Sequence, residues 1–307
     1  MSGSPDRKLP PEWNGLVPTE VFLNEAASIV EKSDKSNVTL RAMGGVGIAL
    51  RCSGEREFAR RLGRLVQGNQ EYTDLDFAGL MKERNKISEF FRGINYDMRR
   101  VTISTAASQR QIYFHPYGYF TVDVLLDKLL IANHPIDFRK RIGTDALTIT
   151  LADLLLEKIQ MWVSFSEKDL KDCLLLLKAH EVSDTGADGD MINSAYIAQL
   201  LSEDWGFYYT ATTNLKRIKD LLMDLDKVGR DVNIDPTRVS ADEREKLVSK
   251  VDHLLRAIED HPKSFGWKMR AKVGTSKQWY REVETPATVG GFGIWNLRDA
   301  SKGQTHA

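Results

Sequence analysis

The sequence predicts an α/β (α+β) amino-terminal domain with a small mixed sheet, followed by a helical carboxy-terminal domain. Up to about residue 145, short runs of β-branched and aromatic residues alternate with amphipathic helical segments. From about residue 150, apolar residues recur mostly at helical spacing. We therefore expect a loose lead-in over residues 1–17, an α/β domain over 18–148, a helical domain over 149–260 and a tail containing tryptophan and glycine over 261–307.

Composition and charge are those of a globular protein. The chain has 307 residues, of which 42% are hydrophobic and 28% charged. The 43 basic and 43 acidic residues cancel, so no overall positive charge indicates a nucleic-acid partner. Cys52 and Cys173 lack metal-ligand spacing and fit a reducing compartment. The first residues contain no apolar segment, and no run approaches the roughly 18 apolar residues of a membrane span, so we expect a cytoplasmic protein with no membrane segment.

Periodicity and turn residues define the elements of the first half. Apolar residues from Val21 to Val30 recur at helical spacing after Pro18-Thr19-Glu20, a suitable helix start. The turn sequence His115-Pro116-Tyr117-Gly118 joins two strand-like runs and predicts a hairpin over 110–126. The remaining predicted elements are a strand over 38–43, an amphipathic segment over 58–66, a strand at 73–77, a helix around 87–91 and a strand over 101–104.

In the second half, apolar residues form helical stripes. The first consists of Leu151, Leu154, Leu155, Ile159 and Trp162, and the second of Leu170, Cys173, Leu174 and Leu177. This change of pattern places the domain boundary near 145–150. The further predicted elements are a loop at 186–189, helices over about 190–203, 207–227 and 241–260, and a loop at 290–293.

Three aspartates lie on predicted strands. Successive strand side chains point to opposite faces, so Asp74 and Asp76 share one face, roughly 7 Å apart along the strand. Two like charges need a cation between them, and carboxylate oxygens suit Mg²⁺. Asp123, on the hairpin, is the candidate for a third carboxylate, with Asp127 as the alternative. The other interpretation is a solvated strand face.

The glycine pair Gly44-Gly45 stands between a predicted strand and a helix that we expect to begin at Val46. Unpaired N–H groups at a helix start attract anions, so a triphosphate suits this position. The alternative is a tight turn that needs glycine only for its backbone conformation.

Two features of the helical half are candidates for the same site. Lys158 falls on the apolar stripe, where a charged lysine must either extend its amino group to solvent or meet an anion. Ser166 and Asp169 fit a capping box at a helix start, which is a structural role for Asp169.

The order of these features resembles the nucleotidyltransferase-fold superfamily. Within it, Gly44-Gly45 followed by Thr73-Asp-Leu-Asp-Phe77, a helical Lys158 and Lys168-Asp169-x-x-Asp172 is similar to the AbiE-type toxins of type IV toxin–antitoxin systems. The similarity extends from about residue 40 to about 178. The sequence departs from that pattern at Val46, where those toxins usually carry Ser or Thr, and at Cys173, which replaces a Leu.

The resemblance implies a metal-dependent transfer of NMP from an NTP to an RNA, such as tRNA, or a protein acceptor. Asp74, Asp76 and Asp123 would hold Mg²⁺ or Mn²⁺, and Asp123 would help to deprotonate the acceptor. The glycine pair, Lys158 and the Asp169/Asp172 pair would bind the nucleotide. A neighbouring antitoxin would be a partner. The alternatives are a non-catalytic nucleotide-binding scaffold and an enzyme acting on a small molecule of the aminoglycoside kind.

Overall fold

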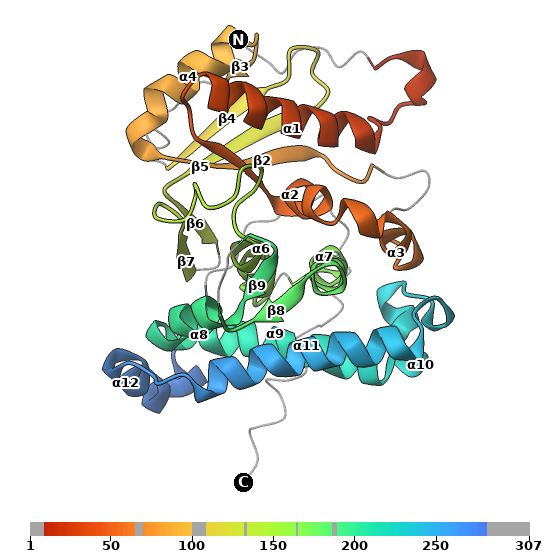
Figure 1. The fold of residues 1–307 in the computed structure, drawn as a ribbon, viewed down its shortest axis with the longest axis vertical. Helices are drawn as coiled ribbons and strands as arrows, with labels where there is room; N and C mark the ends of the chain where they lie inside the picture. The colour runs from red at the N-terminus through yellow and green to blue at the C-terminus, as the bar shows by residue number, and fades with distance from the viewer. Residues whose placement is uncertain are drawn as a thin grey trace.

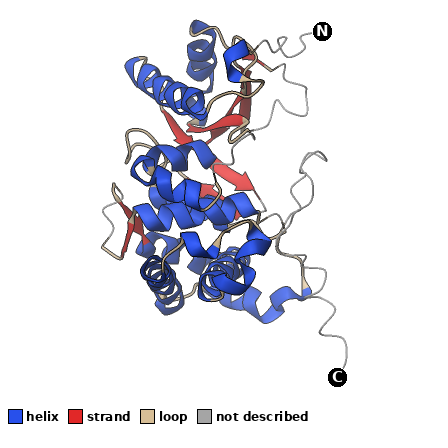
Figure 2. Cartoon of the chain, turned by 90° about the vertical axis from the view of Figure 1, so that its right-hand side faces the viewer, coloured by secondary structure: helices blue, strands red, loops and turns tan. Residues whose placement is uncertain are grey.

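The computed structural model describes residues 9–64, 70–99, 109–131, 134–163, 165–185 and 189–280. It has a mixed sheet flanked by helices towards one end of the molecule and a helical part at the other (Figures 1 and 2). The fold class predicted from the sequence, a mixed sheet with flanking helices followed by a helical part, is confirmed.

The main sheet has five strands in the order β1-β2-β5-β4-β3. β2 and β5 are parallel, and the other neighbours are antiparallel. The predicted hairpin is β4 and β5, joined by a turn in which the Gly118 N–H donates to the His115 carbonyl at 2.8 Å. The predicted strand at 101–104 lies outside the described residues. The strands are β1 (Leu40–Met43), β2 (Asp74–Gly79), β3 (Asp97–Met98), β4 (Arg110–Phe114) and β5 (Thr121–Leu126).

Helices of the first half cover the sheet and lead to its edge. α1 begins at Thr19, as predicted, and Figure 1 shows it lying across the sheet. α2 begins at Gly44, two residues before the expected start at Val46, so both glycines lie in its first turn. The helices are α1 (Thr19–Lys35), α2 (Gly44–Arg51), α3 (Arg56–Arg61) and α4 (Arg84–Gly93), with short 3₁₀ helices at Pro11–Trp13, Ser53–Glu55 and Met81–Glu83.

Four short strands lie beyond the main sheet, in two pairs. β6 (Lys128–Ile131) and β7 (His134–Asp137) form an antiparallel pair. β8 (Glu181–Ser183) and β9 (Met191–Asn193) form a parallel pair. The expected helix over 190–203 is therefore wrong at its start, because β9 occupies its first residues and Asn193 caps the helix at Ser194. Strands of three or four residues are too short to show a two-residue period.

The helical part contains one long pair and several shorter helices. The expected helix over 241–260 is α11 (Ala241–Asp260), and that over 207–227 corresponds to α9 (Trp205–Met223) and α10 (Leu225–Val228). The others are α6 (Leu151–Ile159), α7 (Glu167–Ala179), α8 (Ser194–Glu203) and α12 (Phe265–Val273), with 3₁₀ turns at Gly229–Val232, Pro236–Arg238 and Gly274–Ser276. Residues 186–188 and 290–293 lie outside the described ranges. In the described part of the chain, no helix combines the length and apolarity needed to cross a bilayer.

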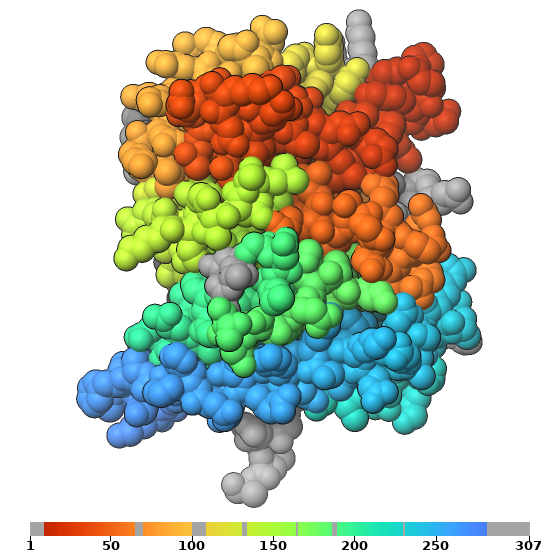
Figure 3. All heavy atoms as spheres, viewed as in Figure 1, coloured from red at the N-terminus to blue at the C-terminus, as the bar shows by residue number. Residues whose placement is uncertain are grey.

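Two hydrophobic cores meet at α2. One core packs α1 against the sheet and includes Leu75 and Phe77 of β2. The other fills the helical part and also takes in side chains of α2 and α3. Val46 of α2 belongs to the first core and Ile48 to the second. In the space-filling view, the α2–α3 segment (orange) accordingly lies against the helical part (green and blue; Figure 3). This packing fixes the amino-terminal end of α2 at the junction between the two.

Candidate active site

The three predicted carboxylates lie on neighbouring strands. Asp76 on β2 stands opposite Asp123 on β5 in the parallel register, and Asp74 is two residues before Asp76. Leu75 and Phe77 are fully buried on the other face of β2, as the strand period requires. Asp123 is 7% exposed, whereas Asp74 is exposed. The alternative Asp127 lies beyond the strand and accepts the Met81 N–H at 2.9 Å.

Neighbouring groups and burial both disfavour the charged form of Asp76. Burial raises its pKa well above the usual value, and the carboxylates of Asp74, Glu157 and Asp123 raise it further. Lys158 acts in the opposite direction but does not outweigh them. A cation at this position would relieve the repulsion, so the donor set, which consists only of carboxylate oxygens, fits Mg²⁺ or Mn²⁺.

Asp123 has a protein partner. Arg110, on the neighbouring strand β4, donates from Nε to Asp123 Oδ1 at 2.7 Å and from Nη2 to the second oxygen. Burial still keeps the pKa of Asp123 above its usual value. Within the described ranges, no group of three or more His, Cys, Asp or Glu side chains is arranged to hold a metal ion. Arg110 would compete with a metal ion for Asp123, and the Arg110 side chain is 56% exposed.

At both residues of the glycine pair, an added Cβ would meet a neighbouring side chain. Gly44 has φ +67°, and a Cβ added there would lie 2.5 Å from Asp76 Oδ2. A Cβ on Gly45 would lie 2.9 Å from Arg64 Nη2. The Gly44 N–H donates to Glu157 Oε2 at 3.0 Å. The first turn of α2 therefore lies between an acidic group on one side and a guanidinium on the other.

Lys158 meets carboxylates of its own chain. Its side chain is 12% exposed, and Nζ lies 3.7 Å from Glu157, 3.6 Å from Asp169 and 3.5 Å from Asp172. Burial lowers the pKa of Lys158, but the three carboxylates raise it by more, and the lysine stays charged. Within the protein the lysine therefore faces carboxylates, and its role in phosphate binding stays a prediction.

Asp169 and Asp172 both face this lysine. Asp169 forms the predicted capping box with Ser166 at the start of α7, and its other oxygen is turned to Lys158. Asp172 is buried and accepts a hydrogen bond from Arg64 Nε at 2.7 Å. Asp172 therefore contacts both Arg64 and Lys158.

Sequence reasoning missed Glu157, Arg64 and Arg110. Almost every residue of α6 is buried, and a helix that is buried on all sides holds charges only in pairs. That rule could have singled out Glu157. Arg64 lies 108 positions before its partner Asp172, and no local sequence pattern predicts that contact.

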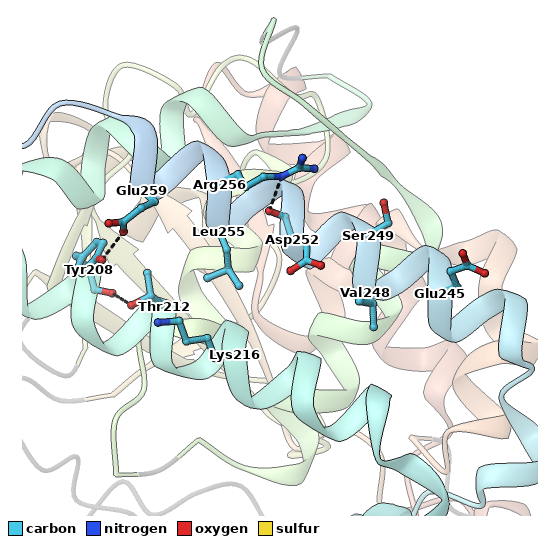
Figure 4. A pocket seen from close by; sticks show the side chains of 10 residues that line it. All are labelled: Tyr208, Thr212, Lys216, Glu245, Val248, Ser249, Asp252, Leu255, Arg256 and Glu259. Carbon is cyan, nitrogen blue, oxygen red and sulfur yellow. Dashed lines mark hydrogen bonds between the residues drawn. The ribbon is translucent and has the colours of Figure 1, made fainter.

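A separate groove of about 640 Å³ lies between α9 and α11 (Figure 4). Tyr208 donates to Glu259 at 2.7 Å on its wall, and Arg256 Nε is bonded to the Asp252 carbonyl. None of the predicted site residues lines it. The lining consists of Tyr208, Thr212, Lys216, Glu245, Val248, Ser249, Asp252, Leu255, Arg256 and Glu259.

No protein-family model matches the chain, and no curated protein matches it. Among solved structures, the chain is similar to the solution structure of the antibiotic-resistance factor ANT(2'')-Ia, described as having substrate-regulated conformation dynamics. The identity is 12%, the match covers 66% of this chain and 95% of that chain, and the TM-score is 0.32. The geometry of the carboxylates and the glycine turn therefore carries the functional conclusion.

Proposed function

We propose that this protein is a metal-dependent nucleotidyltransferase that transfers NMP from an NTP to an acceptor. One observation carries the proposal: Asp76 lies beside Asp123 in register and against the glycine turn of α2, where a Cβ on Gly44 would be 2.5 Å from its carboxylate. The strand carboxylates, which suit divalent cations, thereby lie next to the amino-terminal end of α2, which suits phosphate.

The side chains divide into two groups by charge. Asp74, Asp76 and Asp123 would hold Mg²⁺ or Mn²⁺, which when bound stabilises the attacking and leaving oxygens of the transfer. The Gly45 N–H, the Gly44 N–H once Glu157 releases it, and the ammonium of Lys158 would bind the phosphates of the NTP. Asp169 and Asp172 would act through Lys158, which they hold in place.

Asp123 has a second proposed role, as the group that takes the proton from the acceptor hydroxyl. Its raised pKa favours proton uptake, because a better base has a higher pKa. Arg110 must first release both oxygens. The Arg110 side chain is 56% exposed, so water can reach it when it does so.

The acceptor that we propose is an RNA, such as a tRNA, or a protein, with a neighbouring antitoxin as partner, as the resemblance to AbiE-type toxins implies. A specific observation favours a second candidate, a nucleotide-binding scaffold without catalysis. Asp123 and Lys158 are both already paired within the chain, and a scaffold could keep these pairs permanently.

The test is transfer of label from α-³²P NTPs, with Mg²⁺, to total cellular RNA, total protein and an aminoglycoside panel. We expect labelled RNA or protein with the wild type and with Asp97→Asn, an exposed aspartate at the far edge of the same sheet. With the Asp76→Asn variant, no acceptor should become labelled. Nucleotide binding without transfer to any acceptor would support the scaffold, and transfer by Asp76→Asn would refute the proposed site.

A further inference from the structure

The guanidinium of Arg64 is buried beside the glycine turn. The side chain of Arg64 is 5% exposed, and its guanidinium carbon lies over the Tyr72 ring, 5.2 Å from the ring centroid. Nε donates to Asp172 at 2.7 Å. Among the described residues, no acceptor is hydrogen-bonded to the two terminal amino groups.

These amino groups lie at the start of α2. Nη2 is 2.9 Å from the position that a Cβ on Gly45 would take, and Tyr72 is 3.3 Å from the same point. A glycine at 45 is therefore what lets the guanidinium lie against the first turn. Unlike Gly44, Gly45 has no left-handed backbone angle that would itself require glycine.

We propose that Arg64 is a phosphate-binding residue, which holds a phosphate of the NTP against the N–H groups of the glycine turn. The inference rests on the proposed function and adds a residue to it. A guanidinium presents its amino groups as a planar fork that matches two oxygens of one phosphate, whereas an ammonium acts as a point charge.

Asp172 sets the spacing of two cations in this arrangement. One of its oxygens accepts from Arg64 Nε, and the other lies 3.5 Å from Lys158 Nζ. Glu157 contacts both the Gly44 N–H and Lys158, so both cations lie near the glycine turn, and Asp76 of β2 approaches the same turn at Gly44. A triphosphate placed at this turn would meet positive groups at its phosphates and the metal-binding side chains of β2. Asp172 is a positioning residue here, because a carboxylate itself repels phosphate.

The test measures affinity for two probes, Mg²⁺-ATP and inorganic tripolyphosphate, by calorimetric titration of the full chain. Arg64→Lys keeps the positive charge and should weaken both affinities about tenfold, the loss expected for one charge-assisted hydrogen bond. Gly45→Ala pushes the guanidinium away and should also weaken both. Its fold should stay intact, because alanine is the better helix former. Gly54→Ala is the control, since a Cβ there meets nothing within 4 Å.

Unchanged affinity for both probes in Arg64→Lys and Gly45→Ala would overturn the assignment while leaving the proposed function standing, provided that the wild type binds Mg²⁺-ATP. A lowered melting temperature with wild-type affinity would give Arg64 a purely structural role and would also overturn it. If the wild type binds neither probe, the proposed function fails, and the role of Arg64 fails with it.

Discussion

Asp76→Asn should stabilise the protein at neutral pH while abolishing its response to metal and nucleotide. Burial and the neighbouring carboxylates raise the pKa of Asp76 in the folded state above the unfolded value of about 3.9. The folded state therefore binds this proton more tightly. Its stabilising effect is fully present below the unfolded pKa and is lost as the pH rises through the folded pKa. At neutral pH, Asp76 costs stability, and asparagine removes that cost.

The size of the effect follows from the strand geometry. Asp74 lies about 7 Å along the strand, and at an effective dielectric constant of about 20 the repulsion is about 2 kcal/mol. Asp74 is exposed, so solvent screening reduces this figure, and Lys158 offsets a further part. Desolvation adds to the cost. We expect a net gain of about 1–2 kcal/mol, which corresponds to about 2–4 °C in melting temperature for a chain of this size.

Thermal unfolding between pH 4 and pH 8 in EDTA measures the gain. The difference in melting temperature between Asp76→Asn and the wild type should grow with pH and disappear near pH 4. For the control Asp97→Asn, this difference should not change with pH. Adding Mg²⁺ and nucleotide should raise the melting temperature of the wild type but not of Asp76→Asn, because a ligand stabilises only the state that binds it. The reasoning is refuted if Asp76→Asn is no more stable than the wild type at any pH in this range.

Three further predictions concern other buried groups. Lys158→Ala should lower the free energy of unfolding by about 3 kcal/mol in denaturant titrations, because it leaves buried carboxylates without their counter-ion; an unchanged midpoint would show that these pairs contribute nothing. Gly44→Ala should lower the free energy of unfolding by about 2 kcal/mol, because the residue has φ +67° and its new Cβ would meet the Asp76 carboxylate. Gly54→Ala should change it by almost nothing, and equal denaturation midpoints for the two variants would contradict the contact. Burial raises the pKa of the Cys52 thiol to about 12 and that of Cys173 well above its usual value, so a thiol reagent at pH 8 should label neither in the folded protein, and rapid labelling would disprove their burial.

Local patterns predicted the strand that carries the acidic residues. The alternation in Asp74-Leu-Asp-Phe77 sorted the charged from the apolar side chains, and burial of Leu75 and Phe77 matches it. The capping box of Ser166 and Asp169 was equally readable, because both partners lie within one helical turn. In each case the physical cause acts over four residues or fewer.

Long-range pairs could not be predicted in this way. Arg110 and Asp123 meet only because β4 and β5 are neighbours, and Arg64 meets Asp172 across 108 positions. For Lys158, the helical stripe indicated burial but not the partners, which come partly from the next helix. The sequence therefore indicated the strand aspartates and Lys158 as candidates, but not Glu157, Arg64 and Arg110, which only the fold brings next to them.

α2 lies between two hydrophobic cores, which should make its first turn rigid before a ligand binds. Val46 anchors the helix to one core and Ile48 to the other, so its first turn cannot open without disturbing both. We expect the hydrogen-bonded backbone amides of the last turn of α2 to exchange with deuterium only through global unfolding, as slowly as those of the central strands, whereas the unpaired N–H groups of its first turn exchange without it. The backbone N–H groups of the first turn would then be rigid before an anion binds to them, and binding would cost little conformational entropy.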